Sequence, residues 1–467
     1  MSARRPLVDE RAIPSQPSRA APCALPDTPL AALRSGIDAC VHCGFCLQSC
    51  PTYLTLEDEN DSPRGRVLLM RSALEGTLAL DDPSLETHID RCLGCRACET
   101  ACPSGVPYGH LLEATRATML RERKLPVAAR LILRVFAQPT ILRGAMTMSR
   151  LLRATRVPAL LSRAGGRLGF AMAMLASTSG GPRRDSYTAR SEGNRGRVAL
   201  LLGCVMEGLL TETNRATERT LVTNGYTMVS APGQRCCGAL HAHAGDLDQA
   251  RALARANIAA FERSEAEIIC SNAAGCGAMM KEYGHLLADD PRWSDRAKAI
   301  SDRARDVSEL LAAAGPARGG ALKRRVTYDA PCHLLHAQRI AEAPLALLRA
   351  IPDLELVALE GAEHCCGAAG IYNLVEPDTS NAVLGPKLRN IAATRAELVA
   401  TGNPGCLMQI GAGLRRSSIP ARAVHPVDLL DASYAALQRD AGRGAREAGR
   451  GTRDAGRVNG VRRNSTE

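Results

Sequence analysis

Sixteen of the 18 cysteines in this 467-residue sequence lie in motifs that occur twice, and the first motif is C-x2-C-x2-C-x3-C-P. Its two copies lie 52 residues apart and contain Cys40, Cys43, Cys46 and Cys50, and Cys92, Cys95, Cys98 and Cys102. Three thiolates on one tight loop suit three corners of a 4Fe-4S cubane, and the fourth cysteine, before proline, ligates the other cluster in two-cluster ferredoxins. The spacing therefore predicts two interlocked 4Fe-4S clusters rather than structural zinc, which usually takes two separated C-x2-C pairs.

The same rule predicts the ligands of each cluster. Cluster 1 takes Cys40, Cys43, Cys46 and Cys102, and cluster 2 takes Cys92, Cys95, Cys98 and Cys50. Gly44 and Gly94 lie inside the ligand loops, where the absence of a side chain lets backbone N–H groups approach the sulfurs. Each cluster passes one electron at a time, which suits a step between a reduced flavin and a one-electron or quinone acceptor. We expect the donor cofactor on another chain, because no G-x-G-x-x-G follows a predicted strand.

The second duplication places four cysteines in each half of the C-terminal region. Cys204, Cys236, Cys237 and Cys276 recur as Cys332, Cys365, Cys366 and Cys406, at offsets of 128 to 130 residues, and both halves contain Cys-Cys-Gly. Loops at the strand ends of α/β units bring such side chains together. Four thiolates can hold a further iron–sulfur cluster, which we favour, or a zinc ion, or they can act as redox thiols.

The remaining chemistry-bearing residues near these motifs are assigned supporting roles. We expect His241, His243 and His364, which lie close to the Cys-Cys pairs, to support the sites or to lie at the surface rather than to bind metal. Cys23 and Cys270 belong to neither motif, and we expect them to have no part in the chemistry.

The patterns around the motifs predict an α+β multidomain fold. Helical apolar spacing covers residues 63–75, 108–123 and 247–263, and short apolar strands are expected at 197–202 and 265–269. The predicted parts are a disordered leader (1–30), a helical ferredoxin-type domain (31–115), a basic helical connector and linker (116–196), two Cys-Cys-Gly α/β repeats (197–320 and 321–437), and a disordered Arg/Gly-rich tail (438–467).

Composition and charge limit the compartment in which we expect the protein and the partners that we expect it to bind. The sequence shows no secretory signal and no apolar run of the ~18 residues that a membrane-spanning helix needs, so we expect a reducing cytoplasm. Residues 116–167 contain twelve Lys or Arg and one acid, Glu122. Basic residues among apolar ones, such as Arg130, Arg134, Arg150 and Arg153, suit a peripheral position on anionic lipid or an acidic partner, and a solvated helical face is the alternative. We expect no nucleic acid, because only Phe136 and Phe170 offer aromatic surface there.

Three stretches followed by the two Cys-Cys-Gly repeats resemble the iron–sulfur subunit of glycolate oxidase. They are CVHCGFCLQSCPTY at 40–53, DSPRGR at 61–66 and DRCLGCRACETACPSGVPY at 90–108, and the resemblance extends over residues 30–435. It implies FAD-binding partner subunits that oxidise glycolate to glyoxylate with an acceptor other than dioxygen. It also implies that this chain relays the electrons.

The resemblance leaves a few alternatives. The repeats are also similar to heterodisulfide reductases, whose pattern ends in C-x2-C, but Met279 and Gln409 stand at those final positions, so disulfide-reductase chemistry is not expected. The chain also resembles the iron–sulfur subunit of anaerobic glycerol-3-phosphate dehydrogenase, which shares the module order, and a lactate dehydrogenase subunit is a further alternative. DSPRGR and CVHCGFC favour the glycolate interpretation. From another class, the chain could be a zinc-bearing scaffold that assembles flavoproteins.

Overall fold

The fold is described from a computed structural model, in which residues 23–178 and 194–441 are placed. The N-terminal part consists of short helices around the first eight motif cysteines. They are α1 (Pro29–Ala32), α2 (Arg34–Asp38), η1 (Leu47–Ser49), α3 (Pro51–Leu56), η2 (Glu59–Asp61), α4 (Pro63–Leu74), α5 (Pro83–Asp90), α6 (Ala97–Ala101) and α7 (Tyr108–Met119). Proline at the first turn of α3, α4 and α5 fixes where these helices begin, and the Ser62 hydroxyl accepts from the N–H of Gly65 to cap α4. Leu30, Met70 and Leu111 are fully buried in the core of this domain.

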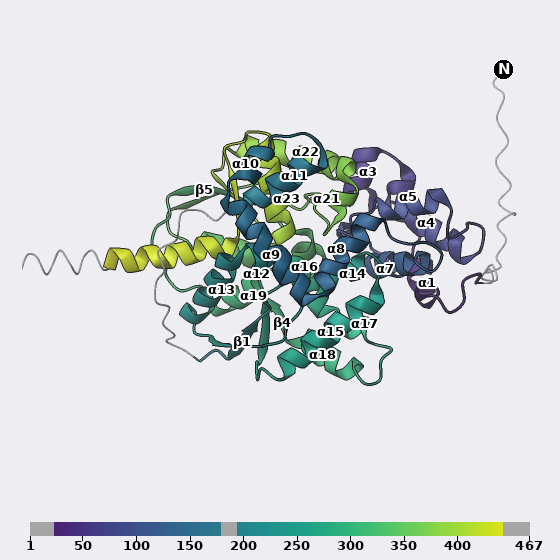
Figure 1. The fold of residues 1–467 in the computed structure, drawn as a ribbon, viewed down its shortest axis with the longest axis horizontal. Coiled ribbons are helices and arrows are strands. Elements are labelled where there is room, and N and C mark those ends of the chain that lie inside the picture. Colours follow the sequence, from purple (N-terminus) through teal and green to yellow (C-terminus); the bar gives the residue numbers. More distant parts are fainter. Residues whose placement is uncertain (1–22, 179–193, 442–467) are drawn as a thin grey trace, which may run out of the picture.

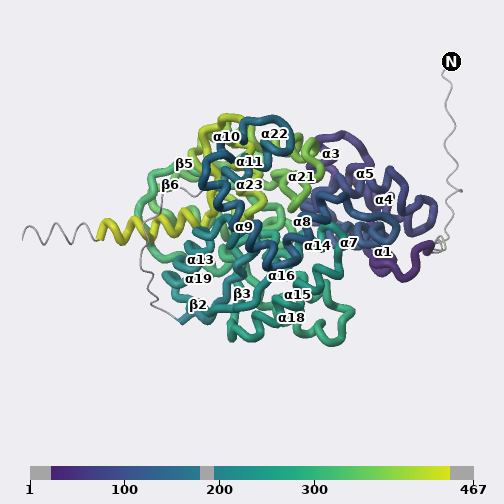
Figure 2. Tube along the Cα trace, viewed as in Figure 1, coloured from purple at the N-terminus to yellow at the C-terminus, as the bar shows by residue number. Residues whose placement is uncertain are grey.

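Four connector helices join the N-terminal domain to the rest of the chain. They are α8 (Val127–Ala137), α9 (Pro139–Ala154), α10 (Val157–Leu161) and α11 (Gly166–Ser177). As Figures 1 and 2 show, α9 crosses the molecule over the first repeat, where it packs on α12 (Cys204–Leu209), and α11 packs on α23 (Pro404–Arg416) of the second repeat. The connector therefore touches both repeats.

Each Cys-Cys-Gly repeat forms a four-stranded parallel sheet covered by helices. The first sheet has the order β2-β1-β3-β4 and the second has the order β6-β5-β7-β8. Their strands are β1 (Arg197–Leu200), β2 (Thr227–Val229), β3 (Ile268–Ser271), β4 (Ala304–Asp306), β5 (Arg324–Tyr328), β6 (Leu354–Val357), β7 (Leu398–Ala400) and β8 (Arg422–Val424). Equal strand order in both sheets shows that the cysteine duplication is a duplication of the whole α/β unit.

The helices of the two repeats follow the strands. In the first repeat, after α12, they are α13 (Thr211–Thr223), α14 (Ala239–His243), α15 (Leu247–Glu262), α16 (Ala274–Lys281), α17 (Tyr283–Leu286), α18 (Ser294–Arg303) and α19 (Val307–Ala314). In the second repeat, besides α23, they are η3 (His333–Ala337), α20 (Glu342–Arg349), α21 (Tyr372–Val375) and α22 (Pro377–Thr394). Val198 and Leu200 of β1 share one hydrophobic core with Val326 of β5 and Val424 of β8. The repeats are thus two halves of one packed body, in which burial of apolar surface holds the sites in place.

The α+β multidomain fold class is confirmed, and the edges of two predicted segments differ. In the predicted leader, residues 1–22 lie outside the described residues, but Leu30 is fully buried and Cys23 packs on the same core. The helix that ends the described chain, residues 426–441, continues past the predicted start of the tail at 438, and residues 442–467 lie outside the described residues. At the N-terminal end, apolar packing extends the order further than composition suggests, whereas residues 438–441 are helical but exposed. Among the described residues, no helix is both long enough and apolar enough to cross a membrane.

Candidate metal centres

The first ligand loop brings three cysteines to the end of the second motif. Cys43 is exposed, whereas Cys40, Cys46 and Cys102 are half-buried. Burial, together with the charges of Cys40 and Cys102, raises the pKa of Cys46 to about 11, and the effect of these charges shows that the three thiols lie close together. The loop turns at Gly44, whose φ of 86° favours glycine. The fourth cysteine of the second motif therefore lies with the thiols of the first.

The second ligand loop forms the complementary group around a cavity. Cys50, Cys92, Cys95 and Cys98 all line this cavity, and each is at most 9% exposed. The N–H of Gly94 lies 3.4 Å from the Cys92 Sγ. This contact is the backbone approach expected at Gly94. Four buried thiols around one void are a donor set that suits the cationic iron of a 4Fe-4S cluster, because isolated buried thiolates would be strongly disfavoured.

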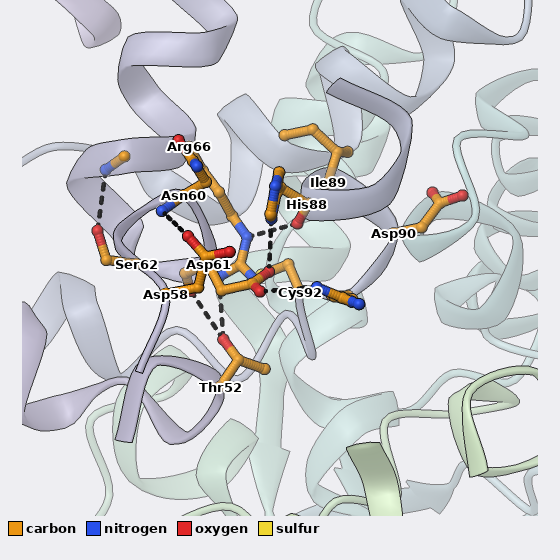
Figure 3. Close-up of polar contacts among 12 residues, drawn as sticks. Thr52, Asp58, Asn60, Asp61, Ser62, Arg66, His88, Ile89, Asp90 and Cys92 are labelled. Carbon is orange, nitrogen blue, oxygen red and sulfur yellow. Dashed lines mark hydrogen bonds and ion pairs between the residues drawn. The ribbon is translucent and has the colours of Figure 1, made fainter. Parts of the chain in front are cut away.

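Asp61 and Arg66, the first and last residues of the DSPRGR stretch, belong to a buried charge network next to this cavity (Figure 3). Arg66 is fully buried, and its Nη1 lies 3.9 Å from the Cys50 Sγ. Its Nη2 donates to Asp61 Oδ1 at 3.0 Å, and its Nε donates to the carbonyl oxygen of His88 at 2.6 Å. The second oxygen of Asp61 accepts from Arg91 at 3.1 Å. The network fixes a guanidinium beside the sulfur, and sequence reasoning did not assign this role.

Two residues of this network, together with Asp58, have side chains that can bind metal ions. Asp58, Asp61 and His88 lie close enough to share a metal ion. Both oxygens of Asp61, however, are held by arginines at hydrogen-bond distance. We therefore interpret this group as the anchor of Arg66 rather than as a metal site.

The first Cys-Cys-Gly site gathers its four cysteines where parallel strands end. Cys204 begins α12 after β1, Cys236 and Cys237 follow β2, and Cys276 lies in α16 after β3. A hydrogen bond to Cys236 and burial raise the pKa of Cys204, and hydrogen bonds to Cys236 and Cys276 raise the pKa of Cys237. The four thiols thus form one connected group.

Two side chains that the sequence analysis did not single out hold the first Cys-Cys loop. Asn257 donates from Nδ2 to the carbonyl oxygen of Cys236 at 3.0 Å, and the Tyr283 hydroxyl donates to that of Cys237 at 2.8 Å. Both side chains are fully buried. They fix the loop with neutral groups.

The second Cys-Cys-Gly site has the same layout with a different support. Cys332 precedes η3, Cys365 and Cys366 follow β6, and Cys406 lies in α23 after β7; side-chain hydrogen bonds connect these thiols in that order. Here the buried support is charged, because Lys387 Nζ lies 2.7 Å from Asp329 Oδ1.

The second site also touches the ferredoxin-type domain. Cys95 packs in one apolar cluster with Cys365, and Cys332 packs against that cluster. The charge of Cys365 acts on Cys95, and the charge of Cys95 acts on Cys332. The Tyr372 hydroxyl closes the junction by donating to the carbonyl oxygen of Arg91 at 2.9 Å. This junction joins residues more than 230 positions apart, so motif spacing could not predict it.

One side chain connects the two Cys-Cys-Gly sites. Asn403 accepts from the N–H of Gly275 through Oδ1 at 3.2 Å, and it donates from Nδ2 to the Cys406 Sγ at 3.6 Å. Gly275 is the residue before Cys276. The thiol group around Cys95 therefore contacts the second site, and Asn403 joins the second site to the first.

The remaining expectations can be compared with the structure. His241 bonds to Asp246 at 2.9 Å and His243 to Glu113 at 2.7 Å through Nδ1, whereas the side chain of His364 is 49% exposed. These are the supporting and surface positions that we expect. Cys270 is fully buried inside β3. Of the two residues at the missing cysteine positions, Gln409 is hydrogen-bonded to Asn373 and Ser380, and Met279 is buried.

Comparison with known families and proteins agrees with this organisation. Residues 36–106 match the 4Fe-4S dicluster domain, and residues 198–281 and 326–411 match the cysteine-rich domain twice. The dicluster match shows that the chain carries iron–sulfur clusters. The first match contains both ligand loops, and the other two each cover the first three strands of a sheet, with β4 and β8 following the matched residues.

Three curated relatives cover much of the chain. The probable glycolate oxidase iron-sulfur subunit of Bacillus subtilis is 38% identical over 84% of this chain and 92% of its own length. The glycolate oxidase iron-sulfur subunit of Escherichia coli is 35% identical over 81% of this chain and 91% of its own length. Lactate utilization protein A of Bacillus velezensis is 30% identical over 50% of this chain and 99% of its own length. With four cysteine groups in the order described and two relatives similar over nearly their whole length, the chain belongs to the family of glycolate oxidase iron–sulfur subunits.

Proposed function

We propose that this chain is the electron-transfer subunit of a flavin-dependent complex that oxidises glycolate to glyoxylate. Electrons pass from FAD-binding subunits, through this chain, to a quinone or another acceptor other than dioxygen. The names of the two most extensive relatives support the substrate. The observation that carries the relay is the packing of Cys95 of the dicluster domain against Cys365 of the second repeat.

The proposed ligands follow the thiol groups. Cys40, Cys43, Cys46 and Cys102 hold cluster 1, and Cys92, Cys95, Cys98 and Cys50 hold cluster 2. Further iron–sulfur clusters are held by Cys204, Cys236, Cys237 and Cys276, and by Cys332, Cys365, Cys366 and Cys406. When bound, such clusters accept and release one electron at a time. Burial of most of these thiols and their mutual hydrogen bonds support the assignment.

The exposed loop at cluster 1 is the proposed docking surface for a flavoprotein subunit. Val41 and Phe45 are each 68% exposed and flank Cys43, the exposed cysteine of the set. Exposed aromatic and aliphatic side chains around a redox site suit a protein interface, which is enriched in such residues at its centre. Electrons would enter at this loop and leave from the first Cys-Cys-Gly site.

The connector helices are the proposed contact with an anionic membrane surface. Leu131, Met148 and Leu151 on α8 and α9 are each at least 59% exposed, beside Arg130 and Arg134. Apolar side chains with neighbouring arginines suit shallow insertion between acidic headgroups. Arg153 is not part of this surface, contrary to our sequence-based grouping, because its guanidinium donates to the carbonyl oxygens of Thr178 and Leu209.

Sedimentation with phosphatidylglycerol vesicles tests the proposed contact with an anionic membrane surface. We expect Leu151→Asp to weaken binding to these vesicles severalfold.

Two alternative functions can be tested against this proposal. The half-length similarity to lactate utilization protein A favours lactate as the second candidate substrate. A zinc-bearing scaffold would contain zinc and no acid-labile sulfide. Anaerobic purification followed by iron, sulfide and zinc analysis separates the scaffold from the relay. Loss of dye-linked glycolate oxidation, with lactate oxidation retained, in extracts of a deletion strain would support glycolate, and the reverse would overturn it.

The proposed contact between cluster 2 and the site in the second repeat can be tested separately. Cys95→Ser should alter the low-temperature paramagnetic spectrum of cluster 2 and that of the site in the second repeat, because Cys95 lies beside both. Cys43→Ser is the matched control in the first loop and should alter cluster 1 alone. Spectra in which Cys95→Ser leaves the second repeat unchanged would contradict the proposed contact.

A further inference from the structure

A cavity of about 340 Å³ opens directly onto the first Cys-Cys-Gly site. It is lined by Cys204 and Cys236 of that site and by Phe136, Leu142 and Met146 of the connector helices α8 and α9. This volume falls in the range of about 300–1,000 Å³ that is usual for small-molecule sites. The lining combines flat apolar contacts with two thiols of a redox site, so a ligand held here would touch a point of electron exchange.

We propose that this cavity is the site where the chain reduces a lipophilic quinone, an inference that rests on the proposed electron-transfer function. The apolar wall suits a quinone ring. The polar groups suit its oxygens, because Arg143, Arg150 and Arg235 also line the cavity. Guanidinium groups donate to carbonyl oxygens and stabilise the negative charge that builds up on the ring during reduction.

The partners of the polar residues show which of them are free for a ligand. Gln234 is committed to the loop, since it accepts from the N–H of Leu202 at 3.0 Å and donates to the carbonyl oxygen of Leu200 at 3.0 Å. Glu207 accepts from Arg215 at 2.9 Å. Within residues 23–178 and 194–441, neither Arg143 nor Arg235 forms an ion pair with another side chain. The cavity therefore presents net positive charge.

The place of the cavity in the molecule favours a quinone over a water-soluble acceptor. It opens onto the first Cys-Cys-Gly site, which Asn403 joins to the second site, and the second site in turn packs on Cys95 of the dicluster domain. Its wall belongs to the same two helices whose outer surface carries Leu131 and Leu151. A quinone arriving from the bilayer would thus meet the cavity beside the surface that we propose contacts lipid.

The reaction balances with the proposed activity. Oxidation of glycolate to glyoxylate releases two electrons and two protons. The quinone takes up two electrons from this chain and two protons from water, and its two C=O groups become C–OH groups of the quinol. No further oxidant or reductant is needed.

Photolabelling with an azido-ubiquinone tests the site on the purified complex with its clusters in place. We expect labelled peptides from residues 136–150 or 202–208, and at least a threefold loss of labelling with Arg143→Gln and with Leu142→Trp, which fills the cavity. The KM for decylubiquinone should rise at least fivefold in both variants. The matched control is Arg163→Gln, an exposed connector arginine outside the cavity, which should match the wild type.

Variants are compared at equal iron content, so that loss of a cluster is not mistaken for loss of the quinone. Labelling that is unchanged by both cavity variants, or that maps to other peptides, would overturn the inference. Failure of glycolate to reduce a water-soluble dye through the wild-type complex would instead overturn the proposed function. Because labelling does not depend on turnover, the two failures can be told apart.

Discussion

At the scale of single residues, the cysteines specify the chemistry and the residues around them adjust it. Arg66 places a buried guanidinium 3.9 Å from the Cys50 Sγ, and Asp61 and the His88 carbonyl oxygen prevent it from moving. Hydrogen bonds and positive charge near a cluster sulfur stabilise the reduced, more negative state. With Cys50 as the proposed ligand of cluster 2, we expect Arg66 to act through Cys50 and to raise the reduction potential of that cluster.

Arg66→Lys should lower the reduction potential of cluster 2, because the shorter ammonium loses the contact with Cys50 while the buried charge stays. Arg66→Met should in addition destabilise the protein by about 3–5 kcal/mol, since it leaves a buried carboxylate without this partner. Redox titration followed by paramagnetic resonance measures the first effect. Arg71→Gln, on the same helix but bonded to the Ile37 carbonyl oxygen, is the control. An unchanged potential in Arg66→Lys would contradict the assigned role.

At the scale of elements, the dicluster helices are fastened to the first repeat through charge. Arg96, in the loop before α6, forms an ion pair with Glu282, the residue that ends α16, and His110 Nε2 of α7 lies 3.5 Å from the same carboxylate. Although burial opposes ionisation, the nearby His110 ring and the Arg96 charge lower the pKa of Glu282 to about 2. The folded state thus favours the ionised carboxylate.

Glu282→Gln should destabilise the protein by about 1.5–3 kcal/mol, the usual range for hydrogen bonds to charged groups. Because the folded pKa is depressed, this stabilisation is fully present above about pH 4.5 and is lost only as the pH falls towards 2. Because Glu282 also raises the pKa of His110 above its ordinary 6.5, urea unfolding should give a difference from wild type that is at least as large at pH 5.5 as at pH 8.0. Glu342→Gln removes an exposed pair with Arg349 and should cost under about 1 kcal/mol. A difference that disappears by pH 5.5 would rule out the depressed pKa.

Local sequence pattern was enough to predict many of the helices and strands, but not how they pack against one another. The helices expected at 63–75 and 247–263 are observed as Pro63–Leu74 and Leu247–Glu262, because turn residues and apolar spacing are local signals. The strand expected at 265–269 lies later, at Ile268–Ser271. The ligand sets stay predictions, although the thiols lie together as the spacing predicts. The Cys95 junction and the Asn403 link depend on long-range packing, which leaves no local pattern.

At the scale of the whole molecule, packing and hydrogen bonds connect the dicluster domain with the two duplicated sheets. The shared core fixes the two Cys-Cys-Gly sites relative to each other, and Asn403 is the side chain that contacts both the Cys406 sulfur and the backbone beside Cys276. The two repeats differ in their buried support, with Lys387 and Asp329 in one and Asn257 and Tyr283 in the other. The second site lies beside a buried ion pair and the first beside neutral side chains, so we expect the two sites to differ in potential.

Asn403→Leu should slow quinone reduction by about tenfold or more, because a rate falls tenfold for each 1.36 kcal/mol of added barrier and the variant removes both polar contacts. Glycolate should still reduce clusters 1 and 2 at the wild-type rate. Stopped-flow absorbance and steady-state quinone reduction measure the two steps separately. Asn390→Leu, which loses only an exposed bond to the Glu360 carbonyl oxygen, is the matched control. Equal slowing in both variants would argue against Asn403 as the link.

The most direct test of the relay is the paramagnetic spectrum of the anaerobically purified complex before and after addition of glycolate. If the dicluster domain lies on the path of the electrons, glycolate should produce signals of reduced 4Fe-4S clusters, and Cys46→Ser should remove or alter one of them. A complex without iron, or clusters that stay oxidised while glycolate is consumed, would contradict the account.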